Sequence, residues 1–333
     1  MDGRQAALRA WAEDTVGAEF QWAPVTGDAS SRRYFRLRFA DRSLICADAP
    51  PQTEKNAAFL SVREQLAGGG LPVPELIAAD LDRGFLLLED FGDRHLQDWL
   101  EAEGPDEDYR GALSLLHKIQ AVAPEGLPSY DRALLGEEYS RFYEWFCLAF
   151  IGLEDEVAGR QIVSAQGELL VEAGLAQPEV FVFRDYHCRN LLVRGGQPLG
   201  MIDFQDAVAG PLCYDLVSLL KDCYIRWPAD RVRGWAVTFR DQRLQNGLDA
   251  GESEAEFLRW FDWIGLHRHL KVLGNFTRLA IRDNKPRYLA DIPMVLAYVE
   301  EVLPRYAEFA PFAQWWREYL APHLVTRGWG GGP

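Results

Sequence analysis

Cysteine is scarce in this sequence, and its spacing carries no binding motif. The five cysteines among 333 residues are scattered, and no two of them form a CxxC pair. This spacing favours neither a disulfide framework nor a zinc site, and it fits a reducing cytoplasm. Long apolar runs are missing as well, because the most apolar stretch, WFCLAFIGL at 145–153, is too short to span a bilayer and the opening residues form no export signal. We therefore expect a soluble, cytoplasmic protein that makes no membrane contact.

Positive charge is also in short supply. Lysine and arginine together number 35 against 50 acidic residues, which gives a formal charge of -15, and Lys55 is the only lysine in the first hundred residues. Binding to nucleic-acid phosphates requires clustered basic side chains over a broad face, so we expect no nucleic-acid partner. The length and the 48% of hydrophobic residues are enough for one large domain or two lobes with real cores. We expect a monomer that binds small molecules.

The secondary-structure signals change in kind near residue 92. Before it, a helix capped by Thr53 should end at the glycine run 68–70, and strands are predicted at 34–40, 42–49 and 84–90. After it, apolar periodicity predicts helices at 106–121, 136–151, 158–174 and 256–282. The chain is therefore predicted to be an α+β protein.

This change predicts two lobes, residues 1–92 and 93–326, followed by a flexible tail at 327–333. The segment 89–93 would be the linker. Clefts between lobes are preferred sites for small ligands, so we expect the ligand there.

Residues 182–207 carry a dense pattern of polar side chains among apolar ones. Within them, LLVR and LGMI are short strand candidates, and the GGQP between them supplies residues that form turns. Closing this hairpin would set Asn190, just before the first strand, beside Asp203, just after the second. Asp185, five residues before Asn190, can reach the same end.

Three oxygen-bearing side chains at one end of a hairpin suit a hard cation such as Mg²⁺, with one carboxylate left to act as a base. The order D-x-x-x-x-N, followed by an apolar residue and D-F, is typical of phosphoryl transfer, in which the first Asp positions or deprotonates an attacking hydroxyl. The structural alternative is that Asp185 and Asn190 form turns and that Asp203 caps the next element. The spacing, the hairpin and the two lobes together favour the catalytic interpretation.

Four blocks, FRDYHCRNLLV, MIDFQDA, GPLCYDLVSLL and LLLEDFGD, resemble the aminoglycoside phosphotransferase and choline kinase family, relatives of the protein kinases. The resemblance covers nearly the whole chain. It implies a two-lobed protein-kinase-like fold, with a small β-rich N-lobe carrying one main helix, a larger helical C-lobe and an ATP cleft between them. It also implies that Asp185 is the catalytic base, that Asn190 and Asp203 bind Mg²⁺, and that Asp215 is structural. His187 stands where protein kinases place a lysine near the γ-phosphate, and the alternative is a loop histidine that packs or hydrogen-bonds.

Further blocks, including GDASSRRYFRLR, KDCYIRWP and the long WFDWIGLHRHLKVLGNFTRLAIRDNKPRYLADIP, are similar to a subgroup of this family that acts on amino sugars. The similarity implies ATP-dependent phosphorylation of the anomeric (C1) hydroxyl of N-acetylmuramate and N-acetylglucosamine to the α-1-phosphate, in peptidoglycan recycling. Two alternatives stay open. One is another small-molecule kinase of the family, acting on an aminoglycoside or choline, and the other is a non-catalytic nucleotide-binding regulator.

The sequence departs from the family pattern at three places. Phe183 stands where many relatives have a histidine, the segment 27–35 has one glycine where a glycine-rich loop would cover the phosphates, and Asp48 stands where a phosphate-pairing lysine is expected. Lys55 or Arg33 would supply the missing positive charge, with Glu64 as its acidic partner or as an ordinary exposed residue. The residues expected to bind the nucleotide are Asp28, Ser30, Ser31, Arg33, Lys55, Glu89 and Phe91, the last two through main-chain contacts to the adenine.

A row of basic and amide side chains follows one side of the helix predicted to end near residue 282. This basic stripe consists of Arg268, Lys271, Asn275, Arg278 and Arg282, at spacings of three and four. It would attract the lactyl carboxylate of muramic acid or the phosphates of ATP, so the first four residues are predicted to bind substrate. The alternative is that these are solvated side chains paired with the surplus acidic residues.

Overall fold

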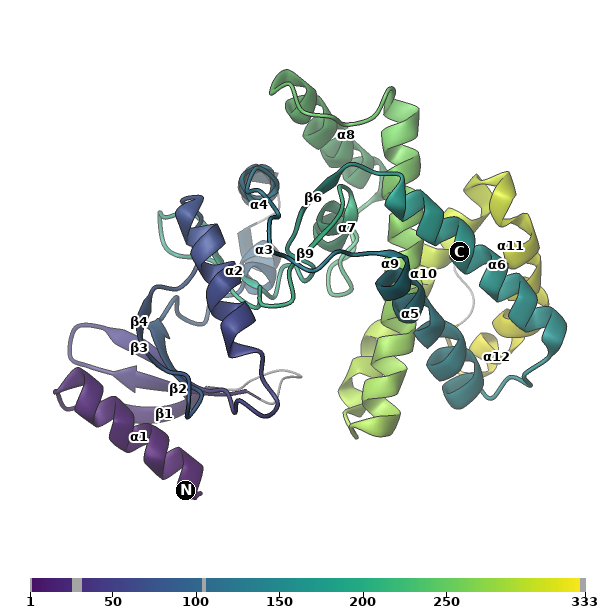
Figure 1. Cartoon of the computed structure of the whole chain (residues 1–333). Helices are drawn as coiled ribbons and strands as arrows, with labels where there is room; N and C mark the ends of the chain where they lie inside the picture. Colours follow the sequence, from purple (N-terminus) through teal and green to yellow (C-terminus); the bar gives the residue numbers. More distant parts are fainter. Residues whose placement is uncertain (1, 26–31, 104–105, 330–333) are drawn as a thin grey trace. The chain divides into compact units, whose positions relative to one another are not determined.

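The computed structural model describes residues 2–25, 32–103 and 106–329. Its contacts divide the chain into two compact units, each assembled from two separate segments of the sequence (Figure 1). Unit 1 consists of Met1–Ile119 and Arg189–Asp206, and unit 2 consists of Gln120–Cys188 and Ala207–Pro333. The lobe boundary at residue 92 stays a prediction. Of the predicted tail, 330–333 lie outside the described residues, while Trp329 stacks on Phe150.

Unit 1 is built on a five-stranded antiparallel sheet. The spatial order of its strands is β1 (Gln21–Val25), β2 (Arg33–Arg38), β3 (Ser43–Asp48), β5 (Phe85–Glu89) and β4 (Leu76–Asp80). The predicted strands correspond to β2, β3 and β5. Alternate residues of these strands, such as Phe35 and Leu37, form a buried face, as the two-residue period of a strand requires. Leu8 and Ala12 of helix α1 (Gly3–Val16) complete this core.

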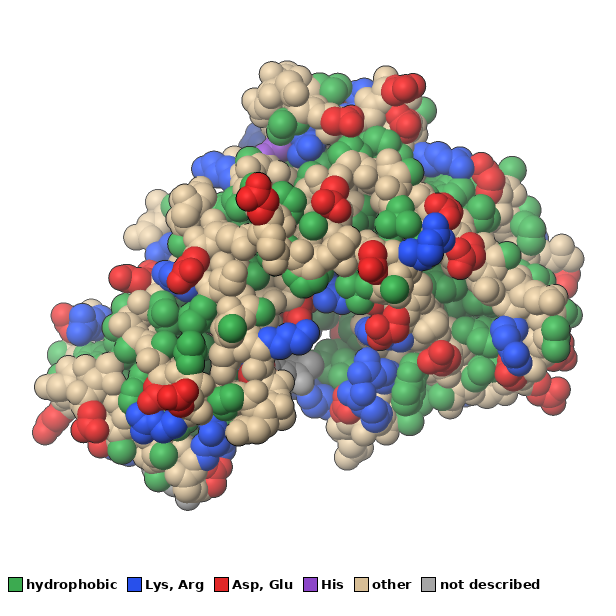
Figure 2. All heavy atoms as spheres, in the orientation of Figure 1, with side chains coloured by type: hydrophobic (Ala, Val, Ile, Leu, Met, Phe, Trp, Pro, Cys, Tyr) green, Lys and Arg blue, Asp and Glu red, His purple; other side chains and the backbone are tan. Residues whose placement is uncertain are grey.

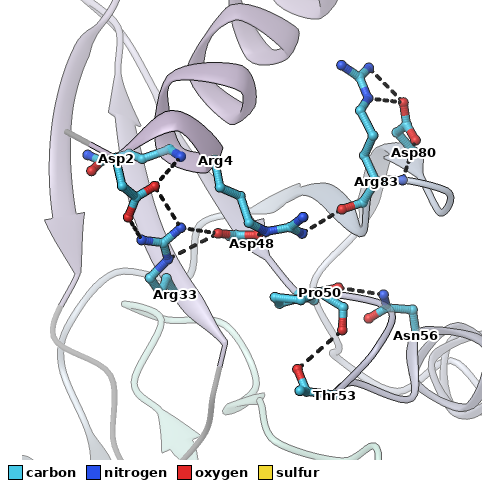
Figure 3. Close-up of polar contacts among 11 residues, drawn as sticks. Asp2, Arg4, Arg33, Asp48, Pro50, Thr53, Asn56, Asp80 and Arg83 are labelled. Carbon is cyan, nitrogen blue, oxygen red and sulfur yellow. Dashed lines mark hydrogen bonds and ion pairs between the residues drawn. The ribbon is translucent and has the colours of Figure 1, made fainter.

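The first helix of unit 1 was not predicted, and the start of the second was predicted wrongly. Helix α1 begins after Asp2, whose carboxylate accepts the N–H of Gln5 at 2.8 Å. Helix α2 (Asn56–Gly68) ends before Gly69, as expected, but its N-cap is Lys55 and not Thr53. The hydroxyl of Thr53 instead donates to the carbonyl of Pro50 at 3.3 Å, within the turn that begins at Pro50 (Figure 3). Unit 1 continues with α3 (Leu96–Glu103) and α4 (Asp106–Gln120).

The predicted hairpin is present and belongs to unit 1. Strands β7 (Leu191–Leu192) and β8 (Gly200–Met201) pair antiparallel, with Leu191 opposite Met201. The turn between them contains Gly195 at φ 48° and Gly196 at φ 76°, a left-handed conformation that glycine adopts without steric cost. The sequence therefore predicted both the pairing and the residues that reverse the chain.

Unit 2 is organised around one long helix, α9 (Glu254–Arg282). It contacts α5 (Arg132–Arg141), the π-helix η1 (Phe142–Ile151), α6 (Val157–Leu175), α7 (Tyr214–Leu220), α8 (Ala229–Gln245), the 3-10 helix η2 (Pro286–Asp291) and α10 (Ile292–Val302). Gly274 allows one of these approaches to be very close, because a Cβ there would lie 2.3 Å from the carbonyl carbon of Arg141. Helix α9 is therefore buried on several sides at once.

The rest of unit 2 adds a short sheet and a helical C-terminal region. Strands β6 (Glu179–Val182) and β9 (Val208–Pro211) form an antiparallel pair that was not predicted. The C-terminal elements are η3 (Leu303–Arg305), η4 (Ala307–Phe309), α11 (Ala310–Trp315), η5 (Trp316–Leu320) and α12 (Ala321–Thr326). Acidic and basic side chains are interspersed on the face shown in Figure 2. Among the described residues, no helix combines the length and apolar character needed to cross a membrane.

Candidate active site

The loop that carries Asp185 is held at both ends by buried carboxylates of unit 2. At its start, Asp215 accepts the backbone N–H groups of Phe183 and Arg184 at 2.6 and 2.8 Å. At its end, Asp222 accepts the N–H of Cys188 at 3.0 Å. Because both carboxylates are almost fully inaccessible to solvent, these bonds are shielded from water. The arrangement leaves the partly exposed side chain of Asp185 on a fixed backbone.

Asp215 makes the contacts that its predicted structural role requires. Burial raises the pKa of its carboxyl to about 7, even though the N–H groups of Phe183 and Arg184 favour the ionised form. Ionisation of this buried side chain therefore costs folding free energy. A carboxylate kept buried at such a cost is consistent with a role in holding the loop.

A second buried network fixes the residue just before Asp185. Arg184 has a φ of 81°, which is unusual for a residue other than glycine. Its guanidinium forms an ion pair with Glu138 of α5, and the same carboxylate accepts from Lys271 of α9 at 2.9 Å and from the hydroxyl of Tyr130. Burial opposes ionisation of Glu138, but Lys271 and Arg184 hold its pKa well below the ordinary value. One carboxylate thus joins α5, α9 and the Asp185 loop.

Asn190 and Asp203 lie at the open end of the β7–β8 hairpin in unit 1. The carbonyl of Asn190 accepts the N–H of Ile202 at 3.1 Å, so the pairing extends one step beyond the strands and Asp203 follows directly. Asp203 is exposed and has a φ of 66°, and Gln205 donates to its carboxylate at 2.8 Å. The hairpin therefore brings these two predicted ligands to the same end.

The donors at this hairpin end fit a hard cation. No group of three or more His, Cys, Asp and Glu side chains within the described residues could hold a metal ion. One amide oxygen and one carboxylate are nevertheless the type of ligand set used by Mg²⁺, which completes its shell with waters and substrate phosphates. Asn190 and Asp203 stay the predicted ligands on that chemical ground.

His187 and Asp185 both belong to unit 2. The His187 ring packs edge to face against Tyr224, with the ring centroids 5.3 Å apart. This contact agrees with the alternative that His187 is a loop histidine that packs against its neighbours. A role of His187 near the γ-phosphate stays a prediction.

The predicted phosphate-binding residues of unit 1 fall into different environments. Arg33 is held by two carboxylates, since its guanidinium contacts Asp2 and lies 2.6 Å from Asp48 (Figure 3). Asp48 is fully buried and is also bonded to Arg4 of α1 at 2.6 Å. Lys55 is exposed at the start of α2. Glu64 is exposed as well, as the alternative expected for an ordinary helical residue.

The other nucleotide predictions concern the end of β5 and the loop before β2. The N–H of Glu89 donates to the carbonyl of Glu75 at 2.9 Å, so this main-chain donor is already used inside the sheet. Its carboxylate pairs with Arg194 at 3.0 Å, and the Arg194 guanidinium lies 4.0 Å from the centroid of the Phe91 ring. Asp28, Ser30 and Ser31 lie outside the described residues.

The basic stripe is not a continuous exposed surface. Arg268 and Lys271 are buried, so the alternative of solvated side chains is wrong for these two, while Asn275 and Arg278 are partly exposed. Lys271 is engaged by Glu138 and by the hydroxyl of Tyr214 at 2.8 Å. The residues of the stripe differ in exposure because the middle of α9 is covered by neighbouring helices on several sides. Its residues therefore have separate roles.

Sequence reasoning missed Asp222 and Glu138. Asp222 lies within KDCYIRWP, where an acidic residue among apolar ones seven positions after Asp215 was an available signal. Glu138 had no comparable signal, because it reads as one of two adjacent acidic residues on an amphipathic helix. Only the tertiary contact with Lys271, far along the chain, shows that it is buried.

The chain has two units, a loop that carries Asp185 and is held by two buried carboxylates, and a hairpin that carries Asn190 and Asp203. These are features expected of a phosphotransferase. The sequence profile of the phosphotransferase enzyme family matches residues 21–258, and the chain belongs to this family. Curated proteins similar to it include the N-acetylmuramate/N-acetylglucosamine kinase of Pseudomonas putida, 40% identical over 92% of this chain and 89% of that protein. The enzyme of the same name from Neisseria meningitidis is 39% identical over 92% of this chain and 93% of that protein.

Solved structures share the fold at low sequence identity. A choline/ethanolamine kinase family protein from Mesorhizobium loti superposes with a TM-score of 0.60 at 14% identity, covering 93% of this chain and 99% of that chain. The ethanolamine kinase of Plasmodium vivax gives a TM-score of 0.63 at 12% identity, covering 92% and 88%. The α+β, protein-kinase-like fold predicted from the sequence is confirmed.

Proposed function

We propose that this chain is an ATP-dependent, Mg²⁺-requiring kinase that phosphorylates the anomeric (C1) hydroxyl of N-acetylmuramate and N-acetylglucosamine. The observation that carries the proposal is the identity of about 40%, over most of both chains, with relatives named as kinases of these two sugars. The product would be the α-1-phosphate. A cytoplasmic monomer acting in peptidoglycan recycling is the setting that this activity suggests.

The proposed chemistry assigns few tasks to protein side chains. Asp185 would accept or orient the proton of the attacking hydroxyl, and its framed loop would fix the direction of attack. Asn190 and Asp203 would hold Mg²⁺, which when bound supplies charge neutralisation on the transferred phosphoryl group. Asp215, Asp222 and Glu138 would act through the loop backbone and not through contact with substrate.

A substrate panel tests the proposal. ADP release should be measured with N-acetylmuramate, N-acetylglucosamine, choline and an aminoglycoside, each with and without Mg²⁺. We expect turnover only with the two amino sugars and only with the metal, and phosphorus NMR should identify an α-1-phosphate. Turnover with choline or the aminoglycoside alone would assign a different kinase activity, and no turnover with any acceptor would support a nucleotide-binding regulator.

Arg268 is proposed to contact the lactyl carboxylate that distinguishes N-acetylmuramate. It is buried on α9, and although burial opposes its charge, Cys223, Tyr214, Asp185 and Asp222 raise its pKa. A cation that interacts with the charge of Asp185 suits an anionic substituent of the sugar. Arg268→Met should therefore raise KM for N-acetylmuramate by about tenfold more than KM for N-acetylglucosamine.

The matched control for this variant is Arg259→Met. Arg259 lies on the same helix but pairs with Glu308 at 2.8 Å, at a solvent-exposed position. It should leave both KM values within about twofold of the wild type. Equal increases for the two sugars in Arg268→Met would remove the lactyl assignment.

A further inference from the structure

The sequence places no lysine where kinase-like enzymes pair one with the nucleotide phosphates, and the structure shows what occupies that position. Asp48, at the end of β3, is buried between Arg4 and Arg33 (Figure 3). Arg33 contacts a second carboxylate, that of Asp2. A phosphate would have to compete with both carboxylates for this guanidinium. The cation that serves the phosphates therefore has to be sought elsewhere in unit 1.

Arg32, the residue before β2, is a buried arginine with an acidic anchor. Its side chain is 3% exposed, and its Nε lies 2.8 Å from Oε2 of Glu54. Its guanidinium also lies over the ring of Phe59 on α2, 5.1 Å from the centroid. A cation paired with a carboxylate next to this helix has the chemistry of the lysine–glutamate pair of kinases, built from other positions in the chain.

The surroundings of Arg32 connect it with the end of the hairpin. Phe59 stacks on Phe204 with the ring centroids 5.0 Å apart, and Phe204 directly follows Asp203. Arg32 over Phe59, and Phe59 stacked on Phe204, place this guanidinium two ring contacts away from the segment that carries the predicted metal ligand.

We infer that Arg32 binds the phosphates of the nucleotide beside Asp203, held in place by Glu54, and that it takes over the task of the absent lysine. This inference rests on the proposed function. A guanidinium has five N–H donors in a planar fork, so one arginine can bond to Glu54 and to a phosphate oxygen at the same time. Anchoring by Glu54 and stacking on Phe59 fix the guanidinium before the nucleotide arrives, which reduces the entropy cost of binding.

The other described cations of this region are engaged differently. Arg36 is bonded to Asp90 at 2.6 Å and also contacts Asp93. Lys55 is exposed. Arg33 is shared by Asp2 and Asp48.

Calorimetric titration of Arg32→Met with ATP and Mg²⁺, and separately with adenosine, tests the inference without any turnover. We expect the Kd of ATP to rise by about 10- to 100-fold, because charge-assisted bonds to phosphate are lost, while the Kd of adenosine stays within about twofold. An unchanged Kd of ATP would overturn the assignment. If wild-type protein bound no ATP, the proposed function would fail as well, whereas ATP binding by the wild type with an unchanged Kd in Arg32→Met would overturn the inference alone.

Arg9→Met is the matched control, since it removes another paired arginine from unit 1, at an exposed place on α1 that is given no role in binding. It should leave the Kd of ATP within about twofold. A second measurement does not depend on the methionine variant folding. The ¹⁵Nε signal of Arg32, assigned by its loss in Arg32→Lys, should shift when ATP is added to wild-type protein and stay in place with adenosine. An Arg32 ¹⁵Nε chemical shift that does not change when ATP is added would contradict the inference.

Discussion

Replacing Asp185 by asparagine should lower kcat for N-acetylmuramate by about 10³-fold, because the group that positions and deprotonates the acceptor hydroxyl is lost. The loop itself should survive the change. Its backbone is held at both ends by Asp215 and Asp222, which the substitution leaves in place. The variant should therefore bind ATP and the sugar with Kd values within about threefold of the wild type, so that the loss appears in kcat alone.

Single-turnover kinetics and calorimetry would separate these effects. Asp241→Asn is a suitable control, because Asp241 is an exposed residue of α8 that contacts only its neighbour Arg240 among the ion pairs described. It should change kcat by less than about twofold. Wild-type kcat in Asp185→Asn would show that another residue of this chain, or the substrate itself, accepts the proton.

Replacing Glu138 by glutamine should lower the free energy of unfolding by about 3–5 kcal/mol, the range expected when one member of a buried ion network is removed. The carboxylate is fully buried and compensates two cations, Arg184 and Lys271. Neutralising it leaves both of them without their counter-charge. Urea denaturation followed by circular dichroism would measure the change.

Glu137 provides a control for the Glu138 variant, and the pH dependence of stability provides a second test. Glu137 lies on the same helix, but its exposed side chain pairs with Arg141 one turn away, so Glu137→Gln should cost at most about 0.5 kcal/mol. Because the pKa of folded Glu138 lies below its ordinary value of 4.5, its contribution is present above pH 4.5 and is lost as the pH falls below it. The difference in free energy of unfolding between wild type and Glu138→Gln should decrease in that acidic range. A difference that stays constant with pH would contradict the explanation by the ion network.

The parts of the fold that could be predicted are those that short segments determine. The hairpin was found because Gly195 and Gly196 permit the left-handed turn and the flanking residues are apolar, all within a few positions. Strand β2 was found from alternation of side chains. Helix α1 was missed because only Leu8 and Ala12 of its fourteen residues are buried, which leaves little periodicity to detect.

The parts that could not be predicted depend on contacts between distant segments. The basic stripe assumed a helix with one covered and one open side, whereas α9 is surrounded, so that Lys271 is buried against Glu138. Arg32 was overlooked in favour of Arg33 because the two are adjacent in sequence and nothing local shows which one meets Glu54 and which one meets Asp48. Pairing of charges across a fold follows from its topology, which residue spacing alone does not contain.

The hairpin that carries Asn190 and Asp203 also sets the order in which the chain can mature on the ribosome. Residues 1–119 of unit 1 leave the ribosome first, but the segment that completes this unit ends at residue 206. Until then, the carbonyls of Pro72 and Arg94 lack the N–H groups of Met201 and Val193 that they accept in the finished protein. Well over half of the chain must be translated before unit 1 can be completed. A nascent or truncated N-terminal fragment should therefore neither hold the metal nor fold to completion alone.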